Sequence, residues 1–276
     1  MTKAILLGLL AETSLHPGSG QAADVIDLPV AREGATGLPH IPDTGLKGAL
    51  RAWARDSGQA NIDTLFGKAD DGAGQLLIST ARLLCLPVRR LDGPYAWVTT
   101  PYLLERLRRD VERGGVGAAP ALNTEPTGSA LLTNATTTTP IYLEEFSFQP
   151  VPLSDPDKAS VEAAITQLVG DSTLAARLCG QLAIMSDEEF GWYAQNALPV
   201  TARNSLNKHK MSENLWYEET LPPDTLLYSL ILPRNTGAED ALSDFGAALQ
   251  SAGYFQAGGN ETVGQGWLRA TVVSAV

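Results

Sequence analysis

KAILLGLLAETSLHPGSG, residues 3–20, joins an apolar run to a turn rich in glycine and proline. The apolar residues 3–11 suit one strand and fall far short of the roughly 18–20 that span a bilayer. The run leads into a polar turn and not into a small-residue cleavage site, so we expect a first strand and no signal peptide. Gly18 and Gly20 around Ser19 mark the turn that follows.

The residues that follow predict a helix after this strand. VIDLPVARE, residues 25–33, is β-branched and strand-like but interrupted by Pro29. Residues 43–58 place Leu46, Leu50 and Trp53 at helical spacing, with a start at Asp43 or Thr44 and a stop at Gly58. Further on we expect strands at 76–88 and 226–232, helices at 100–115 and 240–253, and a closing strand at 268–273. The order strand, helix, strand occurs twice, which predicts an α+β sheet domain of ferredoxin-like type.

The middle of the chain departs from this regular order. Residues 114–140 are rich in Gly, Ala, Pro and Thr, which predicts an irregular insertion. Strand character returns at 141–148, and residues 157–196 read as helical. Residues 198–218 have strand-like ends and a polar, basic middle, typical of a long protruding hairpin. We therefore expect one domain over 1–276 that carries these insertions.

Composition sets limits on function. Apolar residues make up 44% of the chain and charged residues 18%, so a core can form. The net charge of −11 argues against a nucleic-acid partner, but residues 30–120 hold twelve Lys and Arg against ten Asp and Glu. Cys85 and Cys179 lack CxxC spacing, which favours buried thiols in a reducing cytoplasm over a disulfide or a metal pair.

Two cations on the helix at 43–58 suggest a phosphate site. Lys47 and Arg51 are four residues apart and share a face. The helix N-terminus adds backbone N–H groups and about half a positive charge. An ordinary helix start with two solvated cations explains the same residues, and composition alone favours that explanation.

GGNETVGQGW, residues 258–267, is a second candidate ligand loop. Gly258, Gly259, Gly264 and Gly266 allow positive φ and close approach of backbone to a ligand. The spacing matches neither a Walker loop nor GxGxxG. A tight turn is the equally weighted alternative.

Acid–base and metal chemistry rest on few residues. Asp27 lies in an apolar stretch beside Pro29, where a carboxylate can bind a divalent metal or act as a general base. A turn or capping role is the alternative. His16 is a candidate for proton transfer, although a histidine in a loop is more often a surface residue. Three histidines without HExxH or Cys/His clustering make zinc an unfavoured ligand.

The middle of the expected hairpin combines cations with amides, which suits a nucleic-acid backbone. Its candidate RNA-binding residues are Arg203, Asn204, Lys208, Lys210 and Met211. Met211 can wedge between bases. A solvated loop is the competing interpretation.

Segments from one end of the chain to the other resemble the RAMP superfamily. The segments are ETSLHPGSG, DLPVARE, TGLPHIPDTGLKGALR, LFG, PVRRLDGPYAWVTTPYLLERL, IYLEEF, MSDEEF, TARNSL, NLWYEE and GGNETVGQGW. Each is weak alone, and their joint order carries the signal. More narrowly, the chain is similar to the large repeating backbone subunit of the type III-B (Cmr) CRISPR effector.

The resemblance implies a ferredoxin-like, RRM-related palm with a helical insertion and a thumb hairpin at 198–218. It implies copies of the chain stacked helically along crRNA, bound to target single-stranded RNA and to other type III-B subunits in the cytoplasm, with no membrane. Each thumb would kink the guide–target duplex at a regular interval. Lys47 and Arg51 would hold crRNA phosphates, and residues 258–266 would form the family's Gly-rich turn.

The resemblance also makes Asp27 the residue required for metal-dependent cutting of target RNA, with Mg²⁺ or Mn²⁺ as the expected ion. RNA supplies its own nucleophile, because a 2′-OH held in line can attack the adjacent phosphate. The products would be a 2′,3′-cyclic phosphate and a 5′-hydroxyl, with His16 assisting proton transfer.

Two positions depart from the family pattern. Thr80 stands where an Asp often precedes Ala, and Asp43, Thr44 and Gly45 replace a common Ser-Ser pair. The second change adds a carboxylate near the expected phosphate site. The runner-up function is a non-catalytic RNA-binding scaffold of the same superfamily. A third hypothesis, an acidic enzyme for a small substrate, predicts a closed apolar pocket.

Overall fold

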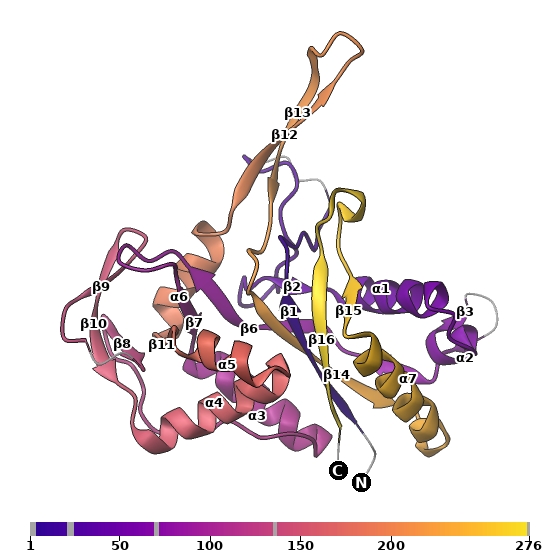
Figure 1. Ribbon diagram of the computed structural model, residues 1–276, viewed down its shortest axis with the longest axis horizontal. Helices are drawn as coiled ribbons and strands as arrows, with labels where there is room; N and C mark the ends of the chain where they lie inside the picture. The colour runs from indigo at the N-terminus through magenta and orange to yellow at the C-terminus, as the bar shows by residue number, and fades with distance from the viewer. Residues whose placement is uncertain (1–3, 21–24, 69–71, 135–136, 275–276) are drawn as a thin grey trace.

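The computed structural model of the protein describes residues 4–20, 25–68, 72–134 and 137–274 (Figure 1). Within them, twelve strands form one sheet, and its centre has the antiparallel order β16-β1-β14-β6. These strands are β1 (Ile5–Ala11), β6 (Ala81–Val88), β14 (Leu226–Pro233) and β16 (Trp267–Ser274). Helix α1 (Asp43–Asp56) follows β1, and α7 (Glu239–Ala252) joins β14 to β16. This βαββαβ path gives the α+β palm that the sequence predicts.

Strand β1 is buried along its whole length because helices cover both faces of the central sheet. On one face, α4 (Asp155–Val169) lies so close that a Cβ at Gly8 would collide with the Leu168 carbonyl. On the other face, α1 and α7 meet through Trp53 and Phe245, whose rings stack edge to face at 5.9 Å. The core therefore has a helix layer on each side of the palm.

A large insertion between β6 and β14 extends the sheet on the side of β6. Its elements are β7 (Ala96–Thr99), α3 (Pro101–Gly114), β8 (Ala130–Thr133), β9 (Ile141–Leu143), β10 (Phe146–Pro152), α4, α5 (Ser172–Cys179), β11 (Leu182–Ile184) and α6 (Asp187–Asn196). The insertion is thus wider than residues 114–140, and of that range only 130–133 lies in a strand among the described residues.

Three local predictions about secondary structure were wrong in detail. The expected helical stretch 157–196 contains β11, since the apolar residues after Gly180 pair with β7 and β8. Residues 141–148 form a hairpin that turns at Glu144, which has φ 49°. Residues 76–88 split into β5 (Leu76–Ile78) and β6. In each case a short apolar run is compatible with more than one element.

The expected hairpin is present as β12 (Val200–Leu206) and β13 (Ser212–Glu219), and it projects away from the palm (Figure 1). We call it the thumb. Residues 25–33, which read as strand-like, form only single bridges, among them Leu28 with Glu218 of β13. Pro29 has no N–H to donate, which prevents a continuous ladder there.

The remaining elements are short. They are β2 (His40–Ile41), α2 (Ile62–Phe66), β3 (Gly67–Lys68), β4 (Gly72–Ala73), β15 (Tyr254–Gln256) and the 3₁₀ helices η1 (Thr236–Ala238) and η2 (Glu261–Val263). Cys85 and Cys179 are free and buried, as predicted. Among the described residues, no helix combines the length and apolarity needed to cross a membrane.

One buried carboxylate fixes part of the insertion. Asp157, near the start of α4, accepts hydrogen bonds from the backbone and side chain of Asn123 and from the Thr124 N–H. Burial raises the pKa of Asp157, but these hydrogen bonds outweigh it and bring the pKa to about 2. The segment after α3 is therefore tied to the N-terminus of α4.

We predict that Asp157→Asn lowers the free energy of unfolding at neutral pH by about 2 kcal/mol, since the native state favours the ionised carboxyl. A group whose folded pKa is depressed stabilises above its unfolded pKa, so this difference should shrink as pH falls from about 4 to about 2. Urea unfolding of both proteins across this pH range is the measurement. A difference that does not change with pH would contradict the assignment.

Candidate functional site

The outer edge of β13, near the palm, gathers the two residues that the sequence nominates for chemistry. The half-buried Asp27 accepts a hydrogen bond at Oδ2 from the Tyr217 N–H at 2.8 Å. His16 bonds through Nδ1 to the Glu219 carbonyl at 2.7 Å. Tyr217 and Glu219 are two residues apart and point their backbone groups to the same edge. Both candidates therefore contact one short stretch of the thumb.

The backbone after Asp27 continues along this edge. The Leu28 N–H donates to the Tyr217 carbonyl at 3.1 Å, and the Glu219 N–H donates to the Leu28 carbonyl at 3.0 Å. The Glu219 side chain, which is buried, accepts from the Val30 N–H at 3.0 Å and pairs with Arg32 at 2.7 Å. The contacts that Leu28, Val30 and Arg32 make with β13 thus hold the Asp27 carboxylate against the thumb.

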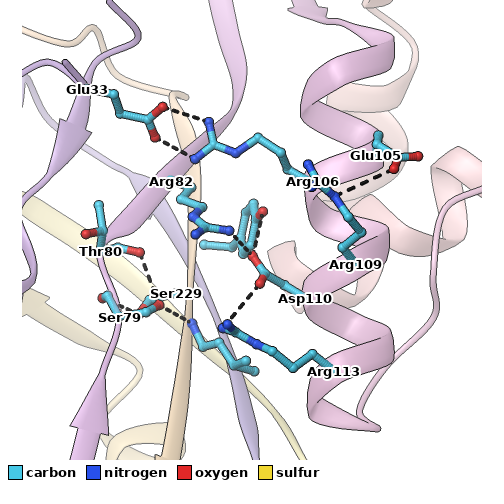
Figure 2. Close-up of polar contacts among 12 residues, drawn as sticks. Glu33, Ser79, Thr80, Arg82, Glu105, Arg106, Arg109, Asp110, Arg113 and Ser229 are labelled. Atoms are coloured by element: carbon cyan, nitrogen blue, oxygen red, sulfur yellow. Dashed lines mark hydrogen bonds and ion pairs between the residues drawn. The ribbon is translucent and has the colours of Figure 1, made fainter. Parts of the chain in front are cut away.

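Glu33 fixes the far end of this segment to α3. Arg106 donates two hydrogen bonds to its carboxylate, at 2.9 and 2.5 Å (Figure 2). Burial raises the pKa of Glu33, but the hydrogen bonds from Arg106 and Thr36 outweigh it and leave the pKa below its ordinary value. The segment carrying Asp27 is therefore clamped between the thumb and the helical insertion.

His16 is not a surface residue. Its side chain is 7% exposed, and Gly258 and Gly259 pack against it. The Gly259 N–H donates to the His16 carbonyl at 2.9 Å, and a Cβ at Gly258 would come within 2.6 Å of that carbonyl oxygen. One ring nitrogen is engaged with Glu219, so the ring has a defined structural contact whatever its chemical role.

The Gly-rich turn owes most of its glycines to local packing. Gly258, Gly264 and Gly266 have φ of +86°, +83° and +80°, which favour glycine. A Cβ at Gly266 would collide with the Ala257 carbonyl, whereas Gly264 is exposed with open space around it. The tight-turn explanation accounts for Gly258 and Gly266, and Gly264 is the position open to a ligand.

A buried carboxylate links this turn to the thumb. Glu218 is 2% exposed, accepts from the Asn260 amide at 2.5 Å and lies 3.6 Å from the Arg203 Nε. Arg203 thus sits near the palm end of the thumb and not at its tip. Sequence reasoning missed Glu218 and Glu219 because a WYEE strand end resembles an exposed hairpin.

The thumb tip carries the other nominated residues. Lys208, Lys210 and Met211 are exposed, and Lys210 turns the chain with φ +61°. The Asn207 side chain accepts from the Met211 N–H at 3.1 Å and shapes this turn. Asn204 is also exposed and accepts from the Ser212 hydroxyl at 2.8 Å.

Lys47 and Arg51 lie on α1, away from the thumb. Arg51 forms an ion pair with Asp63 at 2.6 Å, while Lys47 makes no ion pair within the part of the chain that the structure describes. Asp43, the carboxylate added relative to the family pattern, accepts from the Thr44 N–H at 2.9 Å in the first turn. These residues form a second area, separate from Asp27 in the sequence and in the fold.

Asp27 suits one oxygen-seeking divalent cation. Its Oδ1 has no hydrogen-bond donor among the described residues, and no group of three or more His, Cys, Asp and Glu side chains there forms a complete metal site. Mg²⁺ is commonly held by one or two carboxylates together with water and substrate phosphate. A single fixed carboxylate with a free oxygen fits that pattern.

Comparison with known proteins assigns the chain to a family. A model of the RAMP superfamily matches residues 9–269. The chain belongs to the RAMP superfamily. It is 36% identical to the CRISPR system Cmr endoribonuclease Cmr4 of Pyrococcus furiosus, over 98% of this chain and 96% of that protein.

Solved structures of similar chains share the fold. The crystal structure of oligomeric Cmr4 from Pyrococcus furiosus matches with a TM-score of 0.81 and 31% identity, over all of both chains. A chain in the cryo-EM structure of the type III-B Cmr-beta complex bound to cognate target RNA matches with a TM-score of 0.76 at 21% identity. That match covers 98% of this chain and 96% of the other, and it shows the fold alone.

In this RAMP chain the partly buried Arg32–Glu219 pair should set the position of Asp27. We predict that Glu219→Gln lowers the free energy of unfolding by about 2–3 kcal/mol, somewhat less than a fully buried pair because Arg32 is 24% exposed. Hydrogen exchange at the Val30 amide should also accelerate. Glu112→Gln is the control, since it breaks an exposed pair with Arg108 and should cost under about 0.5 kcal/mol. Equal losses in the two variants would mean that Glu219 is not the anchor.

Proposed function

We propose that the chain is the crRNA-binding backbone subunit of a type III-B CRISPR effector and that it cuts target RNA at regular intervals. The relative named a Cmr endoribonuclease and the oligomeric Cmr4 structure support this assignment. The observation that carries it is the Asp27 carboxylate, fixed by the Tyr217 N–H beside a thumb that projects from the palm.

The proposed chemistry uses the RNA as its own nucleophile. The thumb bends the target strand so that a 2′-OH lies in line with the next phosphate, a geometry that accelerates intramolecular attack. Attack releases a 5′-hydroxyl and leaves a 2′,3′-cyclic phosphate. When bound through Asp27, a divalent cation, Mg²⁺ or Mn²⁺, would neutralise charge that develops on the phosphate.

The side chains of the protein hold Asp27 in place and position the RNA. Asp27 stays in place because the Tyr217 N–H holds its carboxylate, and because Glu219 and Glu33 fix the residues that follow it. Lys208, Lys210 and Met211 at the thumb tip reach the guide–target duplex, where Met211 wedges between bases. Lys47 and Arg51 bind crRNA phosphates, and Arg51 exchanges Asp63 for a phosphate when RNA binds. His16 keeps its place under the Gly-rich turn and assists proton transfer from there.

The partners follow from the same assignment. They are crRNA, target single-stranded RNA, further copies of this chain in a helical stack and the other type III-B subunits. The complex works in the cytoplasm. A scaffold that binds RNA without cutting it is the alternative function within the same superfamily.

Asp27→Asn is the sharpest test of the catalytic role. Asparagine keeps a side-chain oxygen to accept from Tyr217, so the fold and the affinity for target RNA should stay unchanged. Cutting in Mg²⁺ or Mn²⁺ should fall by at least about 100-fold, as expected when a charge-stabilising ligand is lost. Cleavage rate and target affinity would be measured on the assembled complex. Undiminished cleavage by the complex that carries Asp27→Asn would show that Asp27 is not the cutting residue.

Thumb length should set the spacing of cuts. Ser205 pairs with Asn214, so replacing residues 206–213 by Asn-Gly closes a two-residue hairpin and retains Arg203, Tyr217 and Glu218. We expect a folded protein that no longer gives evenly spaced 5′ ends on a long target. A full-length thumb with Lys208→Ala and Lys210→Ala separates lost charge from lost length. Wild-type spacing from the shortened thumb would show that the kink arises elsewhere.

A further inference from the structure

A groove runs between the first turns of α1 and the end of α3, over β5 and β14. It has a volume of about 380 Å³, within the range of about 300–1,000 Å³ typical of small-ligand sites. Lys47 lines it from α1 and Arg113 from α3. Thr44 and Ser79 also line it, and the Ser79 hydroxyl accepts from the Leu230 N–H at 2.9 Å. Leu77, which is 49% exposed, contributes apolar surface.

Arg113 is held at this groove by a buried carboxylate. Asp110, one turn earlier on α3, lies 3.3 Å from the Arg113 guanidinium through Oδ1. Its Oδ2 accepts from Arg82 at 2.5 Å and from the Tyr228 hydroxyl at 3.2 Å (Figure 2). Arg82 already balances the charge of Asp110, so Arg113 brings a positive charge to the groove.

The Arg113 side chain retains donors for a ligand. It is 56% exposed, and the bond to Asp110 uses one of its nitrogens. A guanidinium offers five N–H donors, so most remain available. Asp43 also lines the groove, and its carboxylate accepts from the Thr44 N–H.

We infer that this groove binds one nucleotide unit of single-stranded RNA, with Arg113 as an RNA-binding residue alongside Lys47. The phosphate lies between the two cations. The ribose hydroxyl meets Thr44, and the base covers Leu77 and Leu232. This inference rests on the proposed function and extends the RNA path from α1 across the sheet edge to α3.

The chain provides a closely matched control for Arg113. Arg109 lies one turn earlier on the same helix, is 57% exposed and faces Glu105 at 3.6 Å. It is absent from the lining of the groove. The two arginines thus agree in exposure, helix and an acidic neighbour, and they differ in facing the groove.

The experiment measures binding of a labelled single-stranded RNA of guide sequence to the full chain over a range of salt concentrations. Arg113→Ala should lower the slope of log K against log salt by about 0.7, the value for one lost phosphate contact. Lys47→Ala should do the same, Arg109→Ala should match wild type, and Arg113→Lys should restore most of the slope. Thermal unfolding checks that each variant is folded.

A second measurement does not depend on variants that fold. Photo-crosslinking of thiouridine-substituted RNA to the wild-type chain should recover peptides with residues 76–80 or Arg113. The RNA site in the groove would be overturned by an Arg113→Ala salt slope equal to that of Arg109→Ala together with no crosslink to these peptides. The proposed function would stay intact in that case if Lys47→Ala still weakens binding. Absence of RNA binding by the wild-type chain would refute both.

Discussion

The edge of β13 next to the palm is the constraint on which the candidate site depends. A strand edge offers unpaired N–H and C=O groups at regular spacing. Here that edge is filled by residues 27 and 28 and by the His16 ring, and the buried Glu219 side chain secures Val30 and Arg32 beside it. The thumb therefore does not merely project from the palm. Its palm end is hydrogen-bonded to the segment that carries Asp27.

Buried carboxylates account for part of the net charge of −11, which counts against an RNA partner. Among the described residues, four carboxylates are buried, those of Asp110, Asp157, Glu218 and Glu219. Each is bound by an arginine, an amide or backbone N–H groups, so they act inside the fold and contribute little to the surface field. Net charge counts them equally with exposed acids, which makes it a poor guide to the surface that RNA would meet.

Sequence patterns predicted the elements whose signals are local. The helices at 43–58 and 100–115 and the first strand have spacing and stop residues that need no knowledge of distant contacts. The strand at Leu182–Ile184 was missed because three apolar residues become a strand only when β7 and β8 lie on either side. The prediction of a strand at residues 25–33 was wrong for the opposite reason. Their composition suggests a continuous ladder, and Pro29 breaks it.

The residues of the candidate site also divide into those with a local signal in the sequence and those without one. Asp27, Lys47 and the thumb tip could be nominated because a motif or a run of cations marks them. Glu218, Glu219 and Arg113 could not, because their importance comes from partners far away in the chain: Asn260, Val30 and the groove across β5. A pair of acids at a strand end gives no sign in the sequence that both will be buried.

The most direct test is the structure of the assembled complex with a target RNA that lacks the 2′-hydroxyl at the cutting positions. Such a target binds but cannot react, and Asp27 stays unchanged. The account predicts that at each thumb the phosphate next to the missing hydroxyl lies about 4–5 Å from the Asp27 carboxylate, close enough for one bridging divalent cation. A phosphate more than about 10 Å away, or one bridged through a cation to a carboxylate of another subunit, would contradict the assignment of Asp27 as the cutting residue.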